Sequence, residues 1–328
     1  MLNLIQNQYA MSFNHCKSYR NYRDSYVVYT EEGEQFLVKR LDLQPGRLLF
    51  VHEITQWLLQ QGMQGTEYYI PTNTGALSFQ KGEASYVLMR LEEGDMCNFD
   101  DASHLTESCK MLGKIHQASK GYFPSEQCTP RVELDKIPGI YKKRLDELKK
   151  LKRAASRGRT QFDYLFMTKI NAYIHVAKEA VEALEQSQYD QIVKTYRETG
   201  GFCHHDFTYH NIVFRQAGIY VKNFEFASLE LKEYDVANVI RRKMRKCNWD
   251  IGECYNMLDA YTAFCSISAE EFAVLKIMLQ FPQKFWRIAN KYYNSRKNAF
   301  EKHFVQSLKE VIAELEDHQK LIAALEMF

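Results

Sequence analysis

The most informative stretch of the chain is HHDFTYHNIVFRQAGIYVKNFEF, residues 204–226. Within it, two short runs of β-branched and aromatic residues, 212–214 and 219–221, flank the sequence RQAG. This pattern predicts a short hairpin, because such residues favour strands and the glycine favours a turn. Polar and acidic side chains stand directly before and after the predicted hairpin. We therefore expect the hairpin to bring those side chains together.

The spacing of these polar residues is typical of a phosphotransfer site of the kinase type. Asp206 is followed five residues later by Asn211, and the hairpin then leads to Asn223 and Glu225. In kinases this order supplies a base for the substrate hydroxyl and oxygen ligands for Mg²⁺. We expect Asp206 to be the catalytic base, with His204 beside it fixing the loop through its ring nitrogens. The expected metal ligands are Asn211, Asn223 and Glu225.

The first ninety residues predict strands around one helix, which is where a kinase would hold its nucleotide. The expected strands are residues 25–30, 35–41, 75–79 and 85–91, and the expected helix is residues 48–62. From residue 104 onward helical periodicity dominates. We therefore predict an α+β chain with a strand-rich lobe, residues 1–91, and a helical lobe that carries the hairpin, residues 92–328.

A nucleotide site can be assigned within the strand-rich lobe. Lys39 lies in the middle of a predicted strand and Glu53 lies on the helix that follows. In kinases an ion pair of this kind presents the ammonium group to the phosphates of ATP. The backbone around Met89 and Leu91 is expected to form the hinge that meets adenine. ATP and Mg²⁺ are thus the cofactors that an active enzyme of this type needs.

Several segments spread along the chain carry a family resemblance. They are residues 112–122, 203–211, 224–235, 241–246 before Trp249, 281–286 and 292–294. On these residues the chain resembles the bacterial spore-coat kinase-like (CotS) family, within the aminoglycoside phosphotransferase and choline kinase branch of the protein-kinase-like fold. The resemblance implies a bilobal fold, with a small antiparallel-sheet lobe containing one helix and a large helical lobe. It also implies a role in spore coat assembly in the mother cell, with other coat proteins as partners.

Two positions depart from the family pattern. Asn223 stands where the family usually has a metal-binding Asp, which removes one negative charge from a site for a hard cation. The segment 15–23 has no glycine to bring backbone N–H groups to phosphates, so Lys17, Arg20 or Arg23 would have to substitute. The sequence favours a degenerate kinase, a pseudokinase of the spore coat. The alternative is an active ATP- and Mg²⁺-dependent phosphotransferase acting on a small hydroxyl compound.

Composition sets the outer limits of these interpretations. The chain has 328 residues, with 43 Lys and Arg, 41 Asp and Glu, and 45% hydrophobic residues. These values describe a folded protein and exclude disorder as its main state. No apolar run approaches the ~18 residues of a membrane span. The start of the chain lacks the basic region of a secretory signal, so we expect a cytoplasmic protein that later joins the spore coat.

One stretch is strongly basic. Residues 142–159 contain nine Lys and Arg against two acidic residues. Such a stretch is most often the solvated face of a helix. Contact with an acidic coat partner, an anionic membrane or a nucleic acid stays open, although we do not expect nucleic acid to be the partner.

Overall fold

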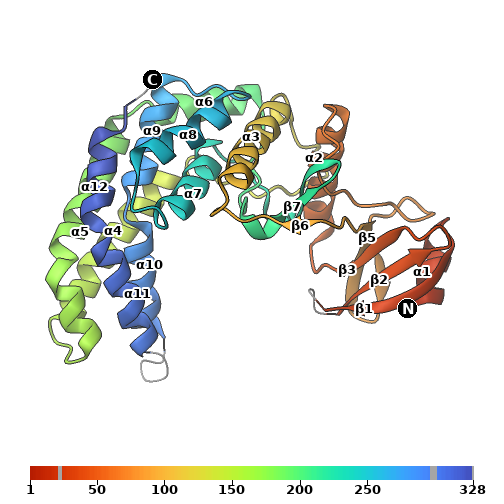
Figure 1. Cartoon of the computed structure of the whole chain (residues 1–328), viewed down its shortest axis with the longest axis horizontal. Coiled ribbons are helices and arrows are strands. Elements are labelled where there is room, and N and C mark those ends of the chain that lie inside the picture. Colours follow the sequence, from red (N-terminus) through yellow and green to blue (C-terminus); the bar gives the residue numbers. More distant parts are fainter. Residues whose placement is uncertain (21–23, 296–300, 327–328) are drawn as a thin grey trace. The chain divides into compact units, whose positions relative to one another are not determined.

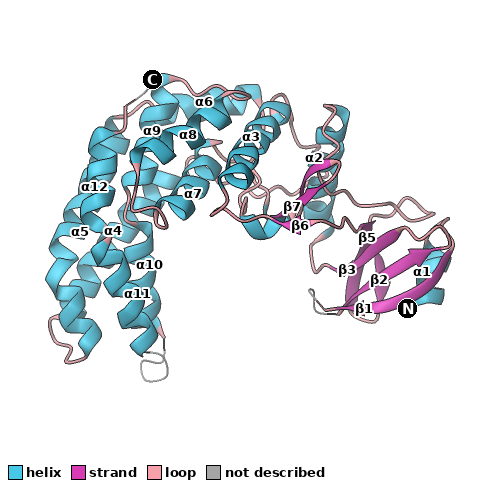
Figure 2. Ribbon diagram, in the orientation of Figure 1, coloured by secondary structure: helices cyan, strands magenta, loops and turns pink. Residues whose placement is uncertain are grey.

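A computed structural model describes residues 1–20, 24–295 and 301–326 of the chain. Figures 1 and 2 show the order of its helices and strands. The chain forms two compact units. The first is Met1–Val132 with Thr199–Glu230, and the second is Glu133–Glu198 with Leu231–Phe328. The predicted boundary lies at residue 91, but the compact units divide the chain elsewhere, because the helix 102–119 and the 212–221 hairpin belong to the same unit as the strands before residue 91.

The first unit is built on an antiparallel sheet of five strands in the order β1-β2-β3-β5-β4. Its strands are β1 (Phe13–Tyr19), β2 (Ser25–Thr30), β3 (Gln35–Arg40), β4 (Phe79–Lys81) and β5 (Ala84–Arg90). The unit also contains the helices α1 (Leu2–Gln8), α2 (Pro45–Gln60) and α3 (Ala102–Ser119). The predicted hairpin 25–41, the helix after it and the strand 85–91 are therefore confirmed. The predicted strand 75–79 lies later in the chain, as β4.

Side-chain alternation along β3 explains where its lysine points. Phe36 and Val38 join the core beneath the sheet, together with Ile5 of α1 and Leu88 of β5. Successive side chains of a strand point to opposite faces. Lys39 therefore leaves the sheet on the face opposite to that core, although it is only 6% exposed. A buried lysine on this face needs partners, and the segment that follows the second sheet supplies them.

The second sheet contains the predicted hairpin. Its three strands, in the order β6-β7-β8, are β6 (Asp95–Met96), β7 (Ile212–Arg215) and β8 (Gly218–Val221). Gly218 has a φ of 106°, a left-handed value that suits glycine in this tight turn. Two short 3₁₀ helices flank the hairpin, η1 (Tyr209–Asn211) before it and η2 (Phe224–Phe226) after it. Asn211 lies in η1 and Glu225 lies in η2, with Asn223 directly before η2.

The segment 15–23 differs from its expected role as a loop over phosphates. Most of it lies in the edge strand β1, paired with β2 from Phe13 to Tyr19. Lys17 is exposed there, with its Nζ 4.8 Å from the centre of the Tyr29 ring. Arg20 follows the strand and is exposed, and Arg23 lies outside the described residues.

The second unit is helical, as Figure 2 shows. Its helices are α4 (Lys136–Ala155), α5 (Gln161–Gln186), α6 (Tyr189–Thr199), α7 (Glu233–Met244), α8 (Ile251–Thr262), α9 (Ala269–Gln280), α10 (Gln283–Asn294), α11 (Glu301–Ala313) and α12 (Leu315–Ala324). Capping boxes at Thr160 and Ser268 begin α5 and α9, because each hydroxyl accepts a backbone N–H of the first turn. Among the described residues, none of the helices combines the length and apolar character of a membrane span.

The basic stretch 142–159 lies mainly on α4. Its lysines 142, 143, 149 and 150 are exposed, whereas Leu145 and Leu148 are buried. Lys142 pairs with Glu185 of α5 at 2.7 Å, and Lys149 pairs with Asp146 at 3.1 Å. The arrangement is that of an amphipathic helix whose charged face is solvated.

Candidate functional site

Lys39 is the centre of a buried polar network that lies entirely within the first unit. Its Nζ donates to Asn223 Oδ1 at 2.8 Å and forms an ion pair with the carboxylate of Glu225. The side chains of Lys39 and Glu225 are 8% and 9% exposed. The strand lysine therefore meets the residues that follow the hairpin.

The network continues from Asn223 to the expected catalytic base. The Asn223 amide Nδ2 donates to Asn211 Oδ1 at 2.6 Å. In turn, Asn211 Nδ2 donates to the Asp206 carbonyl at 2.8 Å and to its carboxylate at 2.9 Å. An unbroken chain of hydrogen bonds thus links Lys39, Asn223, Asn211 and Asp206. The structure brings these sequence-predicted residues together, as the hairpin model requires.

Chemistry fixes the orientation of the Asn223 amide. The ammonium of Lys39 can only donate hydrogen bonds, so the oxygen of Asn223 must face it. The NH₂ group of Asn223 is then left to face Asn211, which can present only its oxygen because its own NH₂ already binds Asp206. A carboxylate at position 223 has no hydrogen to donate, so this contact depends on asparagine.

The predicted metal ligands do not fit Mg²⁺ in this arrangement. Mg²⁺ takes oxygen ligands in near-octahedral geometry at 2.0–2.1 Å. Here Asn211 Oδ1 is bonded to an NH₂ group, and the oxygen of Asn223 is bonded to an ammonium group. The carboxylate of Glu225 is paired with the same ammonium. Each predicted ligand therefore offers an oxygen to a protein donor at the point where a cation would be held.

Two residues that the sequence did not reveal support this network. Glu67 is buried and accepts the backbone N–H of Phe224 at 2.8 Å. Burial, reinforced by the neighbouring carboxylate of Glu225, raises the pKa of Glu67 to about 7, against the opposing effect of Lys39. Arg47 of α2 donates to the backbone carbonyls of Glu225 and Ala227. A charged residue directly before Tyr68 and Tyr69 was the available signal, but no periodicity assigns Glu67 a partner.

The position of Glu67 follows from backbone pairing. Thr66 forms a parallel bridge with Val221, where Val221 N–H donates to the Gly65 carbonyl at 2.7 Å and Glu67 N–H to the Val221 carbonyl at 3.0 Å. A Cβ on Gly65 would lie 2.3 Å from the Ile219 carbonyl oxygen, so only glycine allows this approach. The Glu67 carboxylate is thereby held within hydrogen-bonding distance of the Phe224 backbone N–H.

His204 supports the loop from inside. It has no exposed surface, and its Nε2 lies 3.0 Å from the Lys222 carbonyl oxygen. A carbonyl can only accept, so Nε2 carries the proton, and Nδ1 accepts the backbone N–H of Asp206 at 3.2 Å. Both ring nitrogens are thus used in holding the loop to the residues after β8. This is the role that the sequence indicates for His204, beside the expected base rather than in contact with a substrate.

The predicted ion pair between Lys39 and Glu53 is not formed. The Glu53 carboxylate instead accepts the Tyr122 hydroxyl at 3.1 Å, and it accepts both the hydroxyl and the backbone N–H of Ser125 at 2.6 and 3.2 Å. These hydrogen bonds, which outweigh the opposing effect of partial burial, lower the pKa of Glu53. Glu53 therefore anchors the loop after α3. Glu225, and not Glu53, is the carboxylate that pairs with Lys39.

The predicted hinge residues lie at the end of β5. Met89 is buried and pairs with Leu37 of β3. The backbone N–H of Leu91 donates to the Gln35 carbonyl at 3.0 Å. Since this N–H already extends the sheet, it is not available to a nucleotide base.

A comparison with protein families matches almost the whole chain. The family model described as "Spore coat putative kinase YutH" matches residues 3–325. Spore coat protein S of Bacillus subtilis (strain 168) is 28% identical over 300 residues, which cover 90% of this chain and 85% of that protein.

Solved structures show the same fold. An aminoglycoside phosphotransferase from Alicyclobacillus acidocaldarius matches with a TM-score of 0.85 at 20% identity, covering 99% of this chain and 95% of that one. A spectinomycin phosphotransferase in complex with ADP and spectinomycin matches with a TM-score of 0.64 at 14% identity, covering 97% of each chain. The predicted α+β kinase-like fold is therefore confirmed.

Proposed function

The chain belongs to the YutH family of spore coat kinase-like proteins, and we propose that it acts in spore coat assembly through a phosphotransfer site that has become degenerate. In this proposal it works as a binding protein for other coat proteins, made in the mother cell and carried into the coat. The kinase-like fold is kept as a scaffold. The observation that carries the proposal is the hydrogen bond between the Asn223 amide and Asn211 Oδ1.

In that hydrogen bond, the NH₂ group of Asn223 binds the Asn211 oxygen that a kinase would direct to Mg²⁺. In kinases, an acidic side chain after the hairpin and the asparagine before it both direct oxygen to Mg²⁺. Asparagine at 223 carries no charge, and its NH₂ group occupies the oxygen of Asn211. The ammonium of Lys39 is in addition neutralised by Glu225, so it has little attraction left for phosphate. We therefore expect no Mg²⁺-dependent binding of ATP by the natural chain.

A second candidate is an active ATP-dependent phosphotransferase acting on a small hydroxyl compound. The observation that favours it is the state of Asp206, which stays partly exposed with its carboxylate oriented by Asn211. This function requires Mg²⁺ to displace the Asn223 amide from Asn211. It also requires Lys39 to exchange Glu225 for phosphate.

Titration with ATP, with and without Mg²⁺, separates the two candidates. Thermal unfolding is followed for the natural chain, for Asn223→Asp, and for Asn73→Asp, which makes the same chemical change at an exposed position of the same unit. Aspartate at 223 adds one charge and frees Asn211 Oδ1. A ligand at 100 times its Kd stabilises a protein by about 2.7 kcal/mol. We expect a Mg²⁺-dependent rise in Tm for Asn223→Asp alone.

Two outcomes would contradict these expectations. If the natural chain transfers phosphate from Mg-ATP to a hydroxyl compound, and Asp206→Ala abolishes this turnover, the degenerate-site proposal is overturned. If Asn223→Asp binds no more Mg-ATP than Asn73→Asp does, then the Asn223 amide is not what closes the site.

A further inference from the structure

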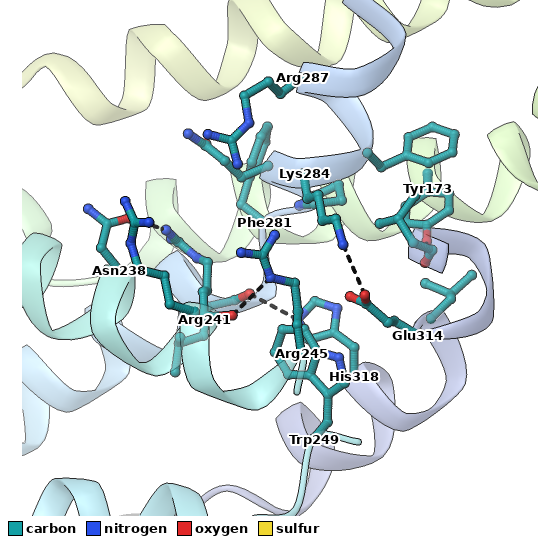
Figure 3. Close-up of a pocket in the computed structure, with 17 residues that line it drawn as sticks. Tyr173, Asn238, Arg241, Arg245, Trp249, Phe281, Lys284, Arg287, Glu314 and His318 are labelled. Carbon is teal, nitrogen blue, oxygen red and sulfur yellow. Dashed lines mark hydrogen bonds and ion pairs between the residues drawn. The ribbon is translucent and has the colours of Figure 1, made fainter. Parts of the chain in front are cut away.

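The second unit contains a pocket that the kinase comparison does not explain. It has a volume of about 120 Å³ and lies among α5, α7, α10, α11 and α12 (Figure 3). Its cationic lining residues are Arg241, Arg242, Arg245, Lys284 and Arg287. Glu314 is the only carboxylate among the described residues that line it. The pocket thus carries a large excess of positive charge.

Lys284 forms an ion pair with Glu314, the one acidic residue among the described residues of the lining. Its Nζ lies 3.0 Å from Glu314 Oε1, and both side chains are largely buried. This pair removes one positive and one negative charge from the balance. The arginines of the pocket are then left without a carboxylate among its lining residues.

Two of these arginines, Arg241 and Arg245, donate to neutral oxygens. Arg241 donates to Asn238 Oδ1 at 2.9 Å and to the Met278 carbonyl at 2.5 Å. Arg245 donates through Nε to the Arg241 carbonyl at 3.1 Å. Such contacts satisfy some N–H groups without neutralising any charge. In Figure 3 the side chains of Arg245 and Lys284 extend into the space between α7 and α10.

Buried donors at the pocket also lack acceptors. Arg241 Nε and Trp249 Nε1 are both buried without a hydrogen-bond partner. A buried donor without an acceptor costs roughly 1–3 kcal/mol, and more for a charged group. Burial lowers the pKa of Arg245, and the nearby guanidinium groups of Arg287 and Arg241 add to this against the effect of Glu314. The pocket therefore holds donors and charge that an anion would satisfy.

The remaining walls set the size and nature of the ligand. Phe281 and Phe285 are buried and apolar, and the Trp249 ring lies 4.2 Å from that of His318. Burial lowers the pKa of His318 to about 4, so its imidazole is neutral at pH 7. A volume of about 120 Å³ is close to the roughly 150 Å³ of an engineered cavity that binds benzene. That space suits one phosphate group with a few further atoms.

We propose that this pocket binds a small phosphorylated compound, a phosphate monoester whose dianion is held by Arg245 and Arg287 from facing sides. Guanidinium forks match the oxygens of phosphate in pairs, and the monoester carries close to two charges at pH 7. The apolar walls contact the rest of the ligand. This site shares no residue with the phosphotransfer site, because its lining residues all lie in the second unit.

Binding of inorganic phosphate and pyrophosphate tests the proposal. Isothermal titration at constant ionic strength, with chloride as the competing anion, is run on the natural chain and on the double variant Arg245→Gln/Arg287→Gln. The matched control is Arg157→Gln/Arg159→Gln, which removes the same charge from exposed positions of the same unit. Each lost charged hydrogen bond is expected to weaken binding about 10-fold. The control is expected to bind as the natural chain does.

A third variant is expected to strengthen phosphate binding rather than weaken it. Glu314→Gln removes the only carboxylate among the described lining residues and frees Lys284, so phosphate is expected to bind about 10-fold more tightly. A general loss of structure cannot produce this gain. Phosphate binding that is absent, that falls equally in both double variants, or that weakens in Glu314→Gln overturns the proposal. Tighter binding of a phosphoserine peptide than of phosphate and pyrophosphate overturns the assignment to a small compound.

Discussion

The two compact units each contain a cluster of charged side chains, and the clusters are built in opposite ways. Around Lys39, acidic and amide groups match the cation, so the hydrogen bonds close on one another. Around Arg245, cations outnumber the single carboxylate, and buried donors stay without acceptors. A closed cluster stabilises the fold and leaves nothing for a ligand. An open cluster strains the fold and gains from a ligand.

The largest effect is expected from opening the closed cluster. Lys39→Met leaves the buried Glu225 carboxylate without its cation, and breaking one side of a buried pair costs about 3–5 kcal/mol. We expect urea unfolding to show a loss of this size. Lys17→Met, on an exposed position of the same sheet, serves as the control and is expected to change little. Adding Glu225→Gln to Lys39→Met should restore part of the loss; if it restores none, the pair is not what stabilises this unit.

A smaller, pH-dependent effect is expected from Glu67. Its pKa is about 7 in the folded chain and near 4.5 in the unfolded chain. Between these values the folded state holds a proton that the unfolded state has released, so the natural chain loses stability as pH rises. Glu67→Gln removes this dependence. Its stability relative to the natural chain is expected to increase by about 1 kcal/mol per pH unit from about pH 4.5 to 7, and then to level off.

Urea unfolding between pH 5 and 8 measures this difference. Two parallel stability curves would show that the Glu67 carboxyl titrates normally in the folded chain. A curve that levels off below pH 6 would show that Lys39 offsets more of the burial than the structure indicates.

The smallest effect, and one of opposite sign, is expected in the open cluster. Arg287→Gln removes an exposed cation that faces other guanidinium groups. Surface changes of this kind are usually within ±0.5 kcal/mol, and here we expect a slight stabilisation. The gain should shrink when salt is raised, because salt screens repulsion between like charges. A clear destabilisation by Arg287→Gln would contradict the description of this cluster as unbalanced.

The features that the sequence predicted well are local ones. A hairpin of two four-residue strands connects Asn211 to Asn223, and Asp206 stands five residues before Asn211. The proximity of the three side chains therefore follows from the turn and from the strand period. The pairing of Lys39 with Glu53 depended instead on how α2 is rotated about its own axis. In the structure the Glu53 side chain meets Tyr122 and Ser125, residues far along the chain.

The features that the sequence missed lack a local signal. The strand β1 is polar on most positions, with only Phe13 buried, so it shows no alternation of apolar residues. The pocket of the second unit likewise has no local signal that predicts it. Arg241 and Arg245 lie one helical turn apart, as do Lys284 and Arg287, which places each pair on one helix face. Which faces meet across α7 and α10 is a matter of long-range packing.

The backbone of Asn223 has a consequence for the history of the site. Its φ of 67° and ψ of 49° lie in the left-handed region, where asparagine and aspartate are the side chains most easily accommodated after glycine. The codons for these two amino acids differ by a single base. A point mutation can therefore exchange an amide for a carboxylate at this position without straining the main chain. Natural variation in this lineage could thus convert a degenerate site into a metal-binding site, or the reverse, without any change of fold.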